Sequence, residues 1–303
     1  MSMQVSIVIV NYNTCDLLRN CLRSVYAQTK DIDFEVVVSD NGSVDGSVEM
    51  VRQEFPQVVL VENKANLGFG PANNRGVNVS KGEFIFYLNS DTLLLNNAIK
   101  IFYDYWKAHE NENLGALGCN LVDGENKISH SYGSFQSASF LLKKMVLHVA
   151  SFYAKNVFKR LGADMSKHQR LPVNEYKTGD VDYVTGADLF VKNDPKYLFD
   201  ENFFLYFEET DIQYRMMKDG LVRRMIDGPS VAHLVRGGAE RPDDVMLCGT
   251  FSLIQSEISK VRFVKKHLSK TVAFLLKFLI SVIWLSPYIF KNTRKHFKAL
   301  WSV

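Results

Sequence analysis

Hydrophobic and polar positions alternate in blocks through the first hundred residues. Short β-branched runs that end in polar residues alternate with segments whose apolar residues recur every three or four positions. The runs predict buried strands and the segments predict helices. The expected strands cover residues 5–12, 34–40, 58–63 and 83–91. The expected helices contain residues 18–25, 43–55, 71–80 and 98–109.

Buried strands that alternate with helices predict a doubly wound, mostly parallel α/β sheet with helices on both faces. Ligands of such sheets bind beyond the carboxyl ends of the strands. Three of the expected strands end in polar clusters, namely NYN (11–13), SDNGSVDG (39–46) and NSDT (89–92). The sequence therefore places the candidate site at this rim of the sheet.

Charge is nearly balanced over the 303 residues, with a formal net charge of +3, so nothing global indicates a nucleic-acid partner. The balance is uneven, because residues 260–303 carry ten Lys or Arg and no Asp or Glu. This basic and apolar tail indicates an anionic membrane surface rather than a polynucleotide. The four cysteines form no cluster with metal spacing and favour free thiols in a reducing cytosol. The first apolar run is too short for a signal peptide, so secretion is not expected.

Two later segments leave several interpretations open. Residues 139–162 predict an amphipathic helix that either packs on the domain or touches a membrane or a lipid-linked substrate. Its expected apolar stripe consists of Leu142, Val146, Val149, Tyr153 and Val157. The apolar segment 272–290 is just long enough to reach across a bilayer core of roughly 30 Å. An in-plane or re-entrant segment, a true span and a soluble helix pair are all compatible with it.

Acidic and glycine-rich stretches at the rim supply the first candidate chemistry. Asp91 at a strand end is a natural ligand for Mg²⁺ or Mn²⁺, although Asp is also a common turn former there. Asp40 either accepts a hydrogen bond from a ligand or only helps to form a turn. The stretch NKANLGFGPANNRG (63–76) precedes a helix and would present N–H groups to an anion. It matches neither the dinucleotide-binding nor the ATP-type phosphate-loop pattern.

The stretch FFLYFEETDIQYR (203–215) crowds Glu208, Glu209 and Asp211 behind aromatic residues. The dipole of a following helix favours acidic residues in its first turn, which gives Asp211 a structural explanation. Crowding and burial also raise a carboxyl pKa toward the value that a general base needs. His233 gains a functional interpretation only if it faces Asp91, because a lone His is usually a packed or surface residue.

Seven stretches together, and in this order, resemble family two glycosyltransferases of the GT-A fold, in particular the bacterial rhamnosyltransferase-like branch. They are VSIVIVNYNTCDLLRNCLRSV, VVVSDNGSVDGS, NLGFGPANNRG, FYLNSDT, VDYVTGADLFVKN, FFLYFEETDIQYRMMKDG and VAHLVRGG. The resemblance covers about residues 4–240. It implies a GT-A glycosyltransferase domain over residues 1–258, with a nucleotide-binding half (1–125) and an acceptor-side half (126–258) that carries a helical insertion at about 138–162. Residues 259–303 would be a membrane-associating helical tail.

The resemblance also implies roles for the matching residues. Asp91 and His233 would bind the metal. Glu209 stands at the position of the family's catalytic carboxylate and would accept a proton, with Glu208 and Asp211 as its neighbours. The residues implied on the donor side are Val10, Asn11, Asp40, Asn66, Gly68, Asn89, Ser90, Gly186, Ala187 and Arg236.

Three positions depart from the family pattern. Asn89 begins the metal motif where the family commonly has a carboxylate, which would weaken metal binding. Glu209 replaces the more common Asp and has a longer side chain. Asp188 replaces a residue that is usually apolar and would mark donor or acceptor selectivity.

The expected function is that of an inverting glycosyltransferase that uses Mg²⁺ or Mn²⁺. It would move rhamnose or another hexose from a dTDP- or UDP-sugar donor to a polyprenyl-diphosphate-linked saccharide in surface polysaccharide assembly. The expected location is the cytoplasmic face of the inner membrane, with peripheral or monotopic attachment. The alternative is a membrane-attached nucleotide-binding scaffold that has lost the chemistry, for which Asn89 and Glu209 are the only support. A nucleotidyltransferase would need a basic, glycine-rich triphosphate loop after the first strand, and NYNTCD offers none.

Overall fold

A computed structural model describes residues 3–160, 175–234, 250–287 and 289–303. The described residues pack into two compact units. Of the described residues, the first unit comprises 3–135, 175–204 and 208–234, and the second comprises 136–160, 205–207, 250–287 and 289–303. Packing therefore groups the helix near residues 138–160 with the C-terminal helices. The expected domain boundary at residue 258 stays a prediction.

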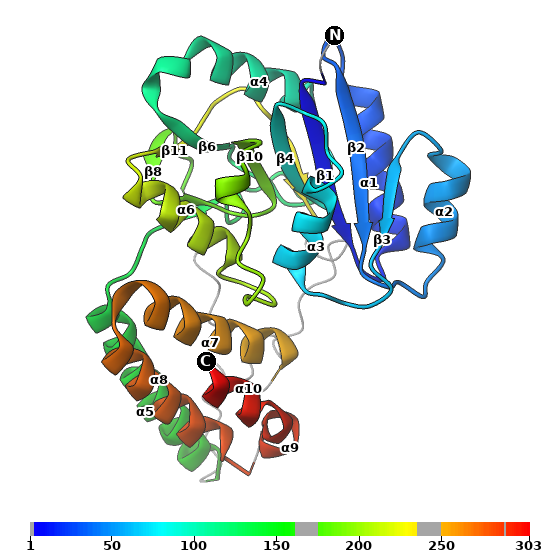
Figure 1. Ribbon diagram of the computed structural model, residues 1–303. Helices are drawn as coiled ribbons and strands as arrows, with labels where there is room; N and C mark the ends of the chain where they lie inside the picture. Colours follow the sequence, from blue (N-terminus) through cyan, green and yellow to red (C-terminus); the bar gives the residue numbers. More distant parts are fainter. Residues whose placement is uncertain (1–2, 161–174, 235–249, 288) are drawn as a thin grey trace. The chain divides into compact units, whose positions relative to one another are not determined.

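The first unit is built on a mixed sheet (Figure 1). Among the described residues the sheet has eight strands, in the order β3-β2-β1-β4-β10-β6-β11-β8. The strands are β1 Val5–Asn11, β2 Phe34–Asp40, β3 Val59–Glu62, β4 Phe84–Asn89, β6 Leu114–Gly118, β8 Gly179–Val181, β10 Asp188–Lys192 and β11 Val222–Met225. The four strands from β3 to β4 run parallel, and β10 is antiparallel to both of its neighbours. The predicted strands and the mostly parallel sheet are confirmed.

Two short strand pairs accompany this sheet in the described part of the chain. The first pair is β5 Thr92–Leu94 with β12 Val231–His233, and the second is β7 Tyr132–Gly133 with β9 Tyr183–Val184. The β5–β12 pair matters for function, because it joins the chain just after β4 to a segment about 140 residues later.

Helices cover both faces of the sheet, as the alternating pattern predicts. They are α1 Cys15–Gln28, α2 Ser47–Glu54, α3 Phe69–Val77, α4 Ala98–Ala108 and α6 Glu208–Lys218, with 3-10 turns η1 Glu110–Glu112 and η2 Pro195–Tyr197. Neighbouring strand residues point to opposite faces, so Ile9 packs with α1, α2 and α4 while Val8 packs with α3 and α6. The stripe expected on α1 is fully buried: Leu18, Cys21, Leu22 and Val25.

The second unit is helical. Its helices are α5 Ala138–Arg160, α7 Phe251–Phe263, α8 Lys270–Trp284, α9 Phe290–Thr293 and α10 Phe297–Ser302, with a π-helical turn η4 Val264–Leu268 and a 3-10 turn η5 Arg294–His296. Hydroxyl caps define two of the starts: Thr250 accepts the Leu253 N–H at 3.3 Å and Ser269 accepts the Val272 N–H at 3.2 Å. Buried residues from α5, α7, α8 and α10 form one apolar core.

The predicted stripe of α5 is wrong in part. Val146 and Tyr153 are 48% and 40% exposed, whereas Leu141 and Met145 are only 6% and 4% exposed. Adjacent apolar pairs at 141–142 and 145–146 allow two stripes, and packing selects the one that the spacing alone did not favour. The side chain of Val157 lies outside the described residues.

The apolar segment 272–290 is not a single helix. α8 ends at Trp284, just before Ser286 and Pro287, and α9 begins at Phe290. Proline lacks the N–H that would continue the helix, which accounts for the break. Nowhere in the described chain is a helix both long and apolar enough to cross a membrane.

Candidate active site

The first two strands end side by side at the rim, with Asn11 in register with Asp40. The Asn11 amide donates to Asp40 Oδ2 at 2.8 Å and to Ser43 Oγ at 3.0 Å. Asp40 Oδ1 accepts the N–H groups of Gly42 at 3.0 Å and of Ser43 at 2.8 Å. Because Asn11 and Asp40 are both buried, these bonds fix the loop after β2 against the strand ends.

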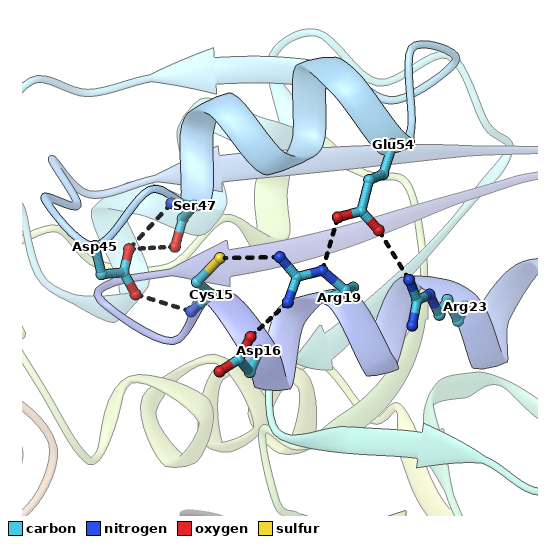
Figure 2. A network of polar contacts seen from close by, with 7 residues as sticks. All are labelled: Cys15, Asp16, Arg19, Arg23, Asp45, Ser47 and Glu54. Atoms are coloured by element: carbon cyan, nitrogen blue, oxygen red, sulfur yellow. Dashed lines mark hydrogen bonds and ion pairs between the residues drawn. The ribbon is translucent and has the colours of Figure 1, made fainter.

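Asp45 ties the starts of two helices together, as Figure 2 shows. Its carboxylate accepts the Cys15 N–H at 2.8 Å and the Ser47 N–H at 3.1 Å, at the first residues of α1 and α2. Partial burial acts to raise the pKa of Asp45, but hydrogen bonds from Ser47 and Cys15 hold it below its ordinary value. Further along α1, Arg19 binds Glu54 of α2 at 2.8 Å. The Asp45 carboxylate and the Arg19–Glu54 pair therefore hold α1 and α2 together.

The glycine-rich loop before α3 is anchored at both ends. The Asn41 amide donates to the Gly68 carbonyl at 3.0 Å, and Asn66 Oδ1 accepts the Gly68 N–H at 3.0 Å. The Phe69 N–H donates to the Phe204 carbonyl at 2.8 Å. Gly68 has φ +94°, and a Cβ added there would lie 2.3 Å from the Phe204 oxygen. This close approach requires glycine, and it joins the loop to the aromatic run before α6.

The β5–β12 pairing brings His233 to Asp91. His233 pairs with Thr92 in the antiparallel register, and the Leu234 N–H donates to the Asp91 carbonyl at 2.8 Å. His233 Nε2 lies 3.2 Å from Asp91 Oδ1. Both side chains are about one-fifth exposed, so both are accessible from solvent. The condition that the sequence set for a functional His233 is met.

Asn89 lies beside this pair at the end of β4, next to Val10 of β1. Its Nδ2 atom is 3.4 Å from His233 Nε2. Its Oδ1 atom is buried and has no hydrogen-bond partner within the described residues. The hydroxyl of the next residue, Ser90, lies 2.9 Å from Thr14 Oγ1 at the start of α1. The Asn89 side chain therefore has a buried oxygen without a described hydrogen-bond partner, beside two side chains of types that can bind a metal.

These residues fit Mg²⁺ or Mn²⁺. Such ions prefer oxygen and commonly take one or two carboxylates, with substrate phosphates and water completing the shell. No group of three or more His, Cys, Asp or Glu with metal geometry occurs in the part of the chain that the structure describes. The donors of Asp91, His233 and Asn89 thus suit an ion that shares its remaining positions with a ligand.

Asp188, the departure noted on β10, is fully buried. Its Oδ2 atom accepts the Cys119 N–H at 2.8 Å, while Oδ1 accepts no hydrogen bond from any described residue. Burial raises the pKa of Asp188 to about 7, although the Cys119 hydrogen bonds and the charge of His233 act to lower it. Its proposed part in selectivity stays a prediction.

The acidic segment opens α6, with Glu208, Glu209 and Asp211 all in the first turn. Asp211 is fully buried, and its carboxylate bonds Arg215 Nε at 3.1 Å. Glu208 is 3% exposed and faces α3, where a Cβ added at Gly70 would lie 3.5 Å from the Glu208 Cβ. These contacts show that the Asp211 and Glu208 side chains are packed inside the first unit.

Glu209 occupies a different environment from its neighbours. It is partly exposed, and it lies against Gly186, where an added Cβ would come within 3.6 Å of the Glu209 Cβ. Desolvation raises the pKa of Glu209 above its ordinary value. Gln213, one turn later, donates to the carbonyls of Glu209 at 3.0 Å and of Val184 at 2.7 Å, which fixes the helix start to β9.

The segment Gly186–Ala187 joins the two clusters. Gly186 borders Glu209, and the Ala187 carbonyl accepts the Asn89 N–H at 3.2 Å. The predicted rim residues thus converge, apart from Arg236, which lies outside the described residues. Gln213 was not foreseen, although its place four residues after Glu209 on a predicted helix would have put it on the same face.

A surface depression elsewhere in the first unit has a volume of about 520 Å³ and is lined in part by Tyr105, Asp180 and Arg224. Arg224 already pairs with Asp180 at 2.6 Å and with Glu112. The charged residues of this depression that we name therefore have a structural role, because they form ion pairs with each other. We therefore place the candidate site at the rim.

The chain matches the model of glycosyl transferase family 2 over residues 6–158, just over half of its length. It is 33% identical over 121 residues to the poly(ribitol-phosphate) beta-glucosyltransferase of Bacillus spizizenii, a match that covers 38% of this chain and 19% of the relative. It is 26% identical over 242 residues to the N-acetylglucosaminyl-diphospho-decaprenol L-rhamnosyltransferase of Mycobacterium tuberculosis, with 75% of each chain covered.

The chain spans only a part of several relatives: the matched segment covers 19% of the Bacillus spizizenii enzyme, and 28% and 30% of two uncharacterized glycosyltransferases from Bacillus subtilis and Nostoc. The crystal structure of GalNAc-T7 with UDP, GalNAc and Mn²⁺ superposes with a TM-score of 0.60 at 14% identity, covering 99% of this chain and 56% of the other. This likeness shows that the fold is of the GT-A type. The order of its motifs, the fold and the matched model lead to one conclusion: the chain belongs to glycosyl transferase family 2.

Proposed function

We propose that this protein is an inverting, metal-dependent glycosyltransferase. It transfers rhamnose or another hexose from a dTDP- or UDP-linked donor to a saccharide carried on a polyprenyl diphosphate, in surface polysaccharide assembly at the cytoplasmic face of the inner membrane. The observation that carries the proposal is the meeting of Asp91 and His233 at the end of β4, joined through Gly186–Ala187 to a desolvated Glu209. Relatives named for ribitol-phosphate and decaprenyl-diphosphate acceptors support the acceptor class.

The donor side uses the rim residues. Asp40 holds the nucleotide base with the backbone around Val10 and Asn11 beside it, and the loop with Asn66 and Gly68 borders the donor. Asp91, His233 and Asn89 hold Mg²⁺ or Mn²⁺. When bound, the ion offsets the negative charge that grows on the leaving diphosphate.

The acceptor side uses Glu209. Its carboxylate takes the proton from an acceptor hydroxyl as that oxygen bonds the anomeric carbon and the bond from that carbon to the diphosphate oxygen breaks. The nucleoside diphosphate leaves, and a single displacement from the opposite face inverts the anomeric configuration. Because desolvation raises the pKa of Glu209, the basic form accumulates at a higher pH than for an ordinary Glu. Transfer should therefore fall as the pH is lowered through that pKa.

The test is a donor screen. The full chain is incubated with Mn²⁺ or Mg²⁺, a lipid-linked saccharide acceptor and a panel of nucleotide sugars, and nucleoside diphosphate release and product are followed. We expect metal-dependent transfer from one donor class. Asp91→Ala should abolish it, and Glu209→Gln should lower kcat by about 10²–10⁴-fold with donor binding retained.

The matched control is Glu201→Gln, the same chemical change at an exposed carboxylate just before α6, and it should transfer at the native rate. Full transfer by Glu209→Gln would remove Glu209 from the mechanism. Tight nucleotide binding without transfer from any donor in the presence of lipid-linked acceptors would instead identify a scaffold that has lost its chemistry.

A further inference from the structure

Helix α8 of the second unit is apolar on both sides. Its inner side is buried in the unit's core, and the residues there are Ala273, Leu276, Ile280, Ile283 and Trp284. Its outer side carries Phe274 and Phe278, and Leu285 follows as the C-cap; these side chains are 59%, 57% and 60% exposed. These positions are 4 and 11 residues apart, about one and three turns, so they share one face. A surface helix of a water-exposed domain normally carries polar residues on that face.

Neighbouring helices extend this outer face with aromatic residues. The Trp301 ring of α10 lies edge-on to Phe274 with centroids 6.1 Å apart, and its indole N–H donates to Ser281 Oγ at 3.1 Å. Tyr153 of α5 donates its hydroxyl to the Val282 carbonyl of α8 at 2.7 Å. Trp301 and Tyr153 are 44% and 40% exposed. Side chains with an apolar ring and a polar end are the type found at the boundary between lipid and water.

The C-terminal part of the unit that carries this face is strongly basic. Residues 250–303 contain ten Lys or Arg against a single acidic residue, Glu257. The Glu257 carboxylate is directed into the unit, where it accepts the Trp284 indole N–H at 2.7 Å, so it does not offset the surface charge. The exposed cations of the described residues in this range are Lys265, Lys266, Lys270, Lys291, Arg294, Lys295 and Lys298. Lys277, on α8 itself, places its ammonium 5.8 Å from the Trp301 ring centre.

We propose that this outer face binds the surface of an anionic phospholipid bilayer, with α8 lying in the plane of the membrane. A helix of 15 residues is about 22 Å long, shorter than a bilayer core of roughly 30 Å. Exposed apolar side chains on a unit rich in exposed cations are complementary to acyl chains below a layer of anionic headgroups. This inference rests on the proposed function, because it identifies the part of the chain through which that enzyme would reach the membrane surface.

The test measures co-flotation of the full chain with vesicles of phosphatidylcholine alone and of phosphatidylcholine with 30% phosphatidylglycerol. We expect binding to the anionic vesicles that weakens with added salt, and weak binding to the neutral ones. The double variant Phe274→Ser, Phe278→Ser should bind at least about tenfold more weakly. A control double variant, Val79→Ser, Leu95→Ser, removes exposed apolar side chains of the first unit and should bind like the native chain.

Three results would overturn the proposal. The first is that the native chain does not bind anionic vesicles, and the second is that the Phe274→Ser, Phe278→Ser variant binds them like the native chain. The third is that the native chain is a dimer in solution and this variant is a monomer, because a second copy would then cover the face. Circular dichroism checks that both double variants are folded. The Asp91→Ala variant should bind vesicles like the native chain, so a failed transfer assay and a failed membrane site are distinguishable.

Discussion

Replacing Gly68 by Ala should damage the protein much more than replacing Gly46 by Ala, although both glycines have positive φ. Gly46 has φ +85° and ψ 6°, and a Cβ added there meets nothing within 4 Å. Gly68 has φ +94° and ψ 179°, a region that is essentially restricted to glycine. Its added Cβ would lie 2.3 Å from the Phe204 oxygen and 2.9 Å from the Phe204 Cα.

The magnitude follows from what has to move. At Gly46 only the left-handed conformation is penalised, which costs about 1–2 kcal/mol. At Gly68 the backbone penalty is about 1–3 kcal/mol, and a carbon needs about 3.3 Å from a carbonyl oxygen. The loop must therefore retreat by about 1 Å and give up the hydrogen bond from the Phe69 N–H, which adds roughly 1 kcal/mol. With the overpacking cost of about 1–3 kcal/mol, Gly68→Ala should lower the free energy of unfolding by about 3–7 kcal/mol.

Equilibrium urea unfolding of the two variants and the native chain measures the difference in free energy of unfolding. Nucleotide affinity, measured in parallel, should fall for Gly68→Ala, because the displaced loop carries the proposed donor contacts of Asn66 and Gly68. It should not change for Gly46→Ala beyond the loss of folded protein. Free energies of unfolding for the two variants that agree within about 0.5 kcal/mol would refute the close approach of this loop to Phe204.

The remaining predictions concern two carboxylates. The folded-state pKa of Asp188, about 7, lies above its unfolded value, so the native chain should lose stability as pH rises from about 4 to 7 and lose no more above that range. Asp188→Asn keeps an acceptor for the Cys119 N–H and should remove this fall in stability with pH, measured by thermal unfolding between pH 4 and pH 8. If the variant loses as much stability over this range as the native chain, the raised pKa of Asp188 is contradicted. Asp45→Ala removes the bonds to the Cys15 and Ser47 N–H groups and should lower the free energy of unfolding by about 1–2 kcal/mol in urea. Asp45→Asn should lose less at pH 7, and equal losses would show that the acceptor oxygens are not what matters.

The rim of the site was predictable because it depends on strand periodicity. Asn11, Asp40 and Asn89 follow continuous apolar runs, and the carboxyl ends of neighbouring parallel strands must lie together. The contact between Asp91 and His233 was harder to predict from the sequence, because it depends on the two three-residue strands β5 and β12. Strands this short carry too few residues to show an alternation, and only the family resemblance indicated the pair.

Other features of the structure cannot be predicted from the residue types. On α5, side-by-side apolar pairs such as Leu141–Leu142 satisfy two helical stripes equally, and only the shape of the partner helices decides between them. Tyr206 and Phe207 adopt left-handed conformations with φ 67° and 68°, which aromatic residues rarely do. Sequence reasoning assigns such conformations to glycine or asparagine and therefore misses them.

These two left-handed residues bear on where the catalytic part of the chain ends. Each costs about 1–2 kcal/mol in this conformation, so other contacts must hold them. Helix α7 supplies such contacts: the Phe263 ring packs against the Phe207 ring at a tilt of 44° with centroids 5.6 Å apart, and Ser259 Oγ donates to the Leu205 carbonyl at 2.9 Å. Glu208 and Glu209 follow these residues directly in the chain. A chain shortened to residues 1–258 lacks both contacts, so Tyr206 and Phe207 would lose the packing that offsets the cost of their conformation. The helical unit therefore includes residues 205–207, and the predicted boundary at residue 258 would separate them from the side chains that hold them.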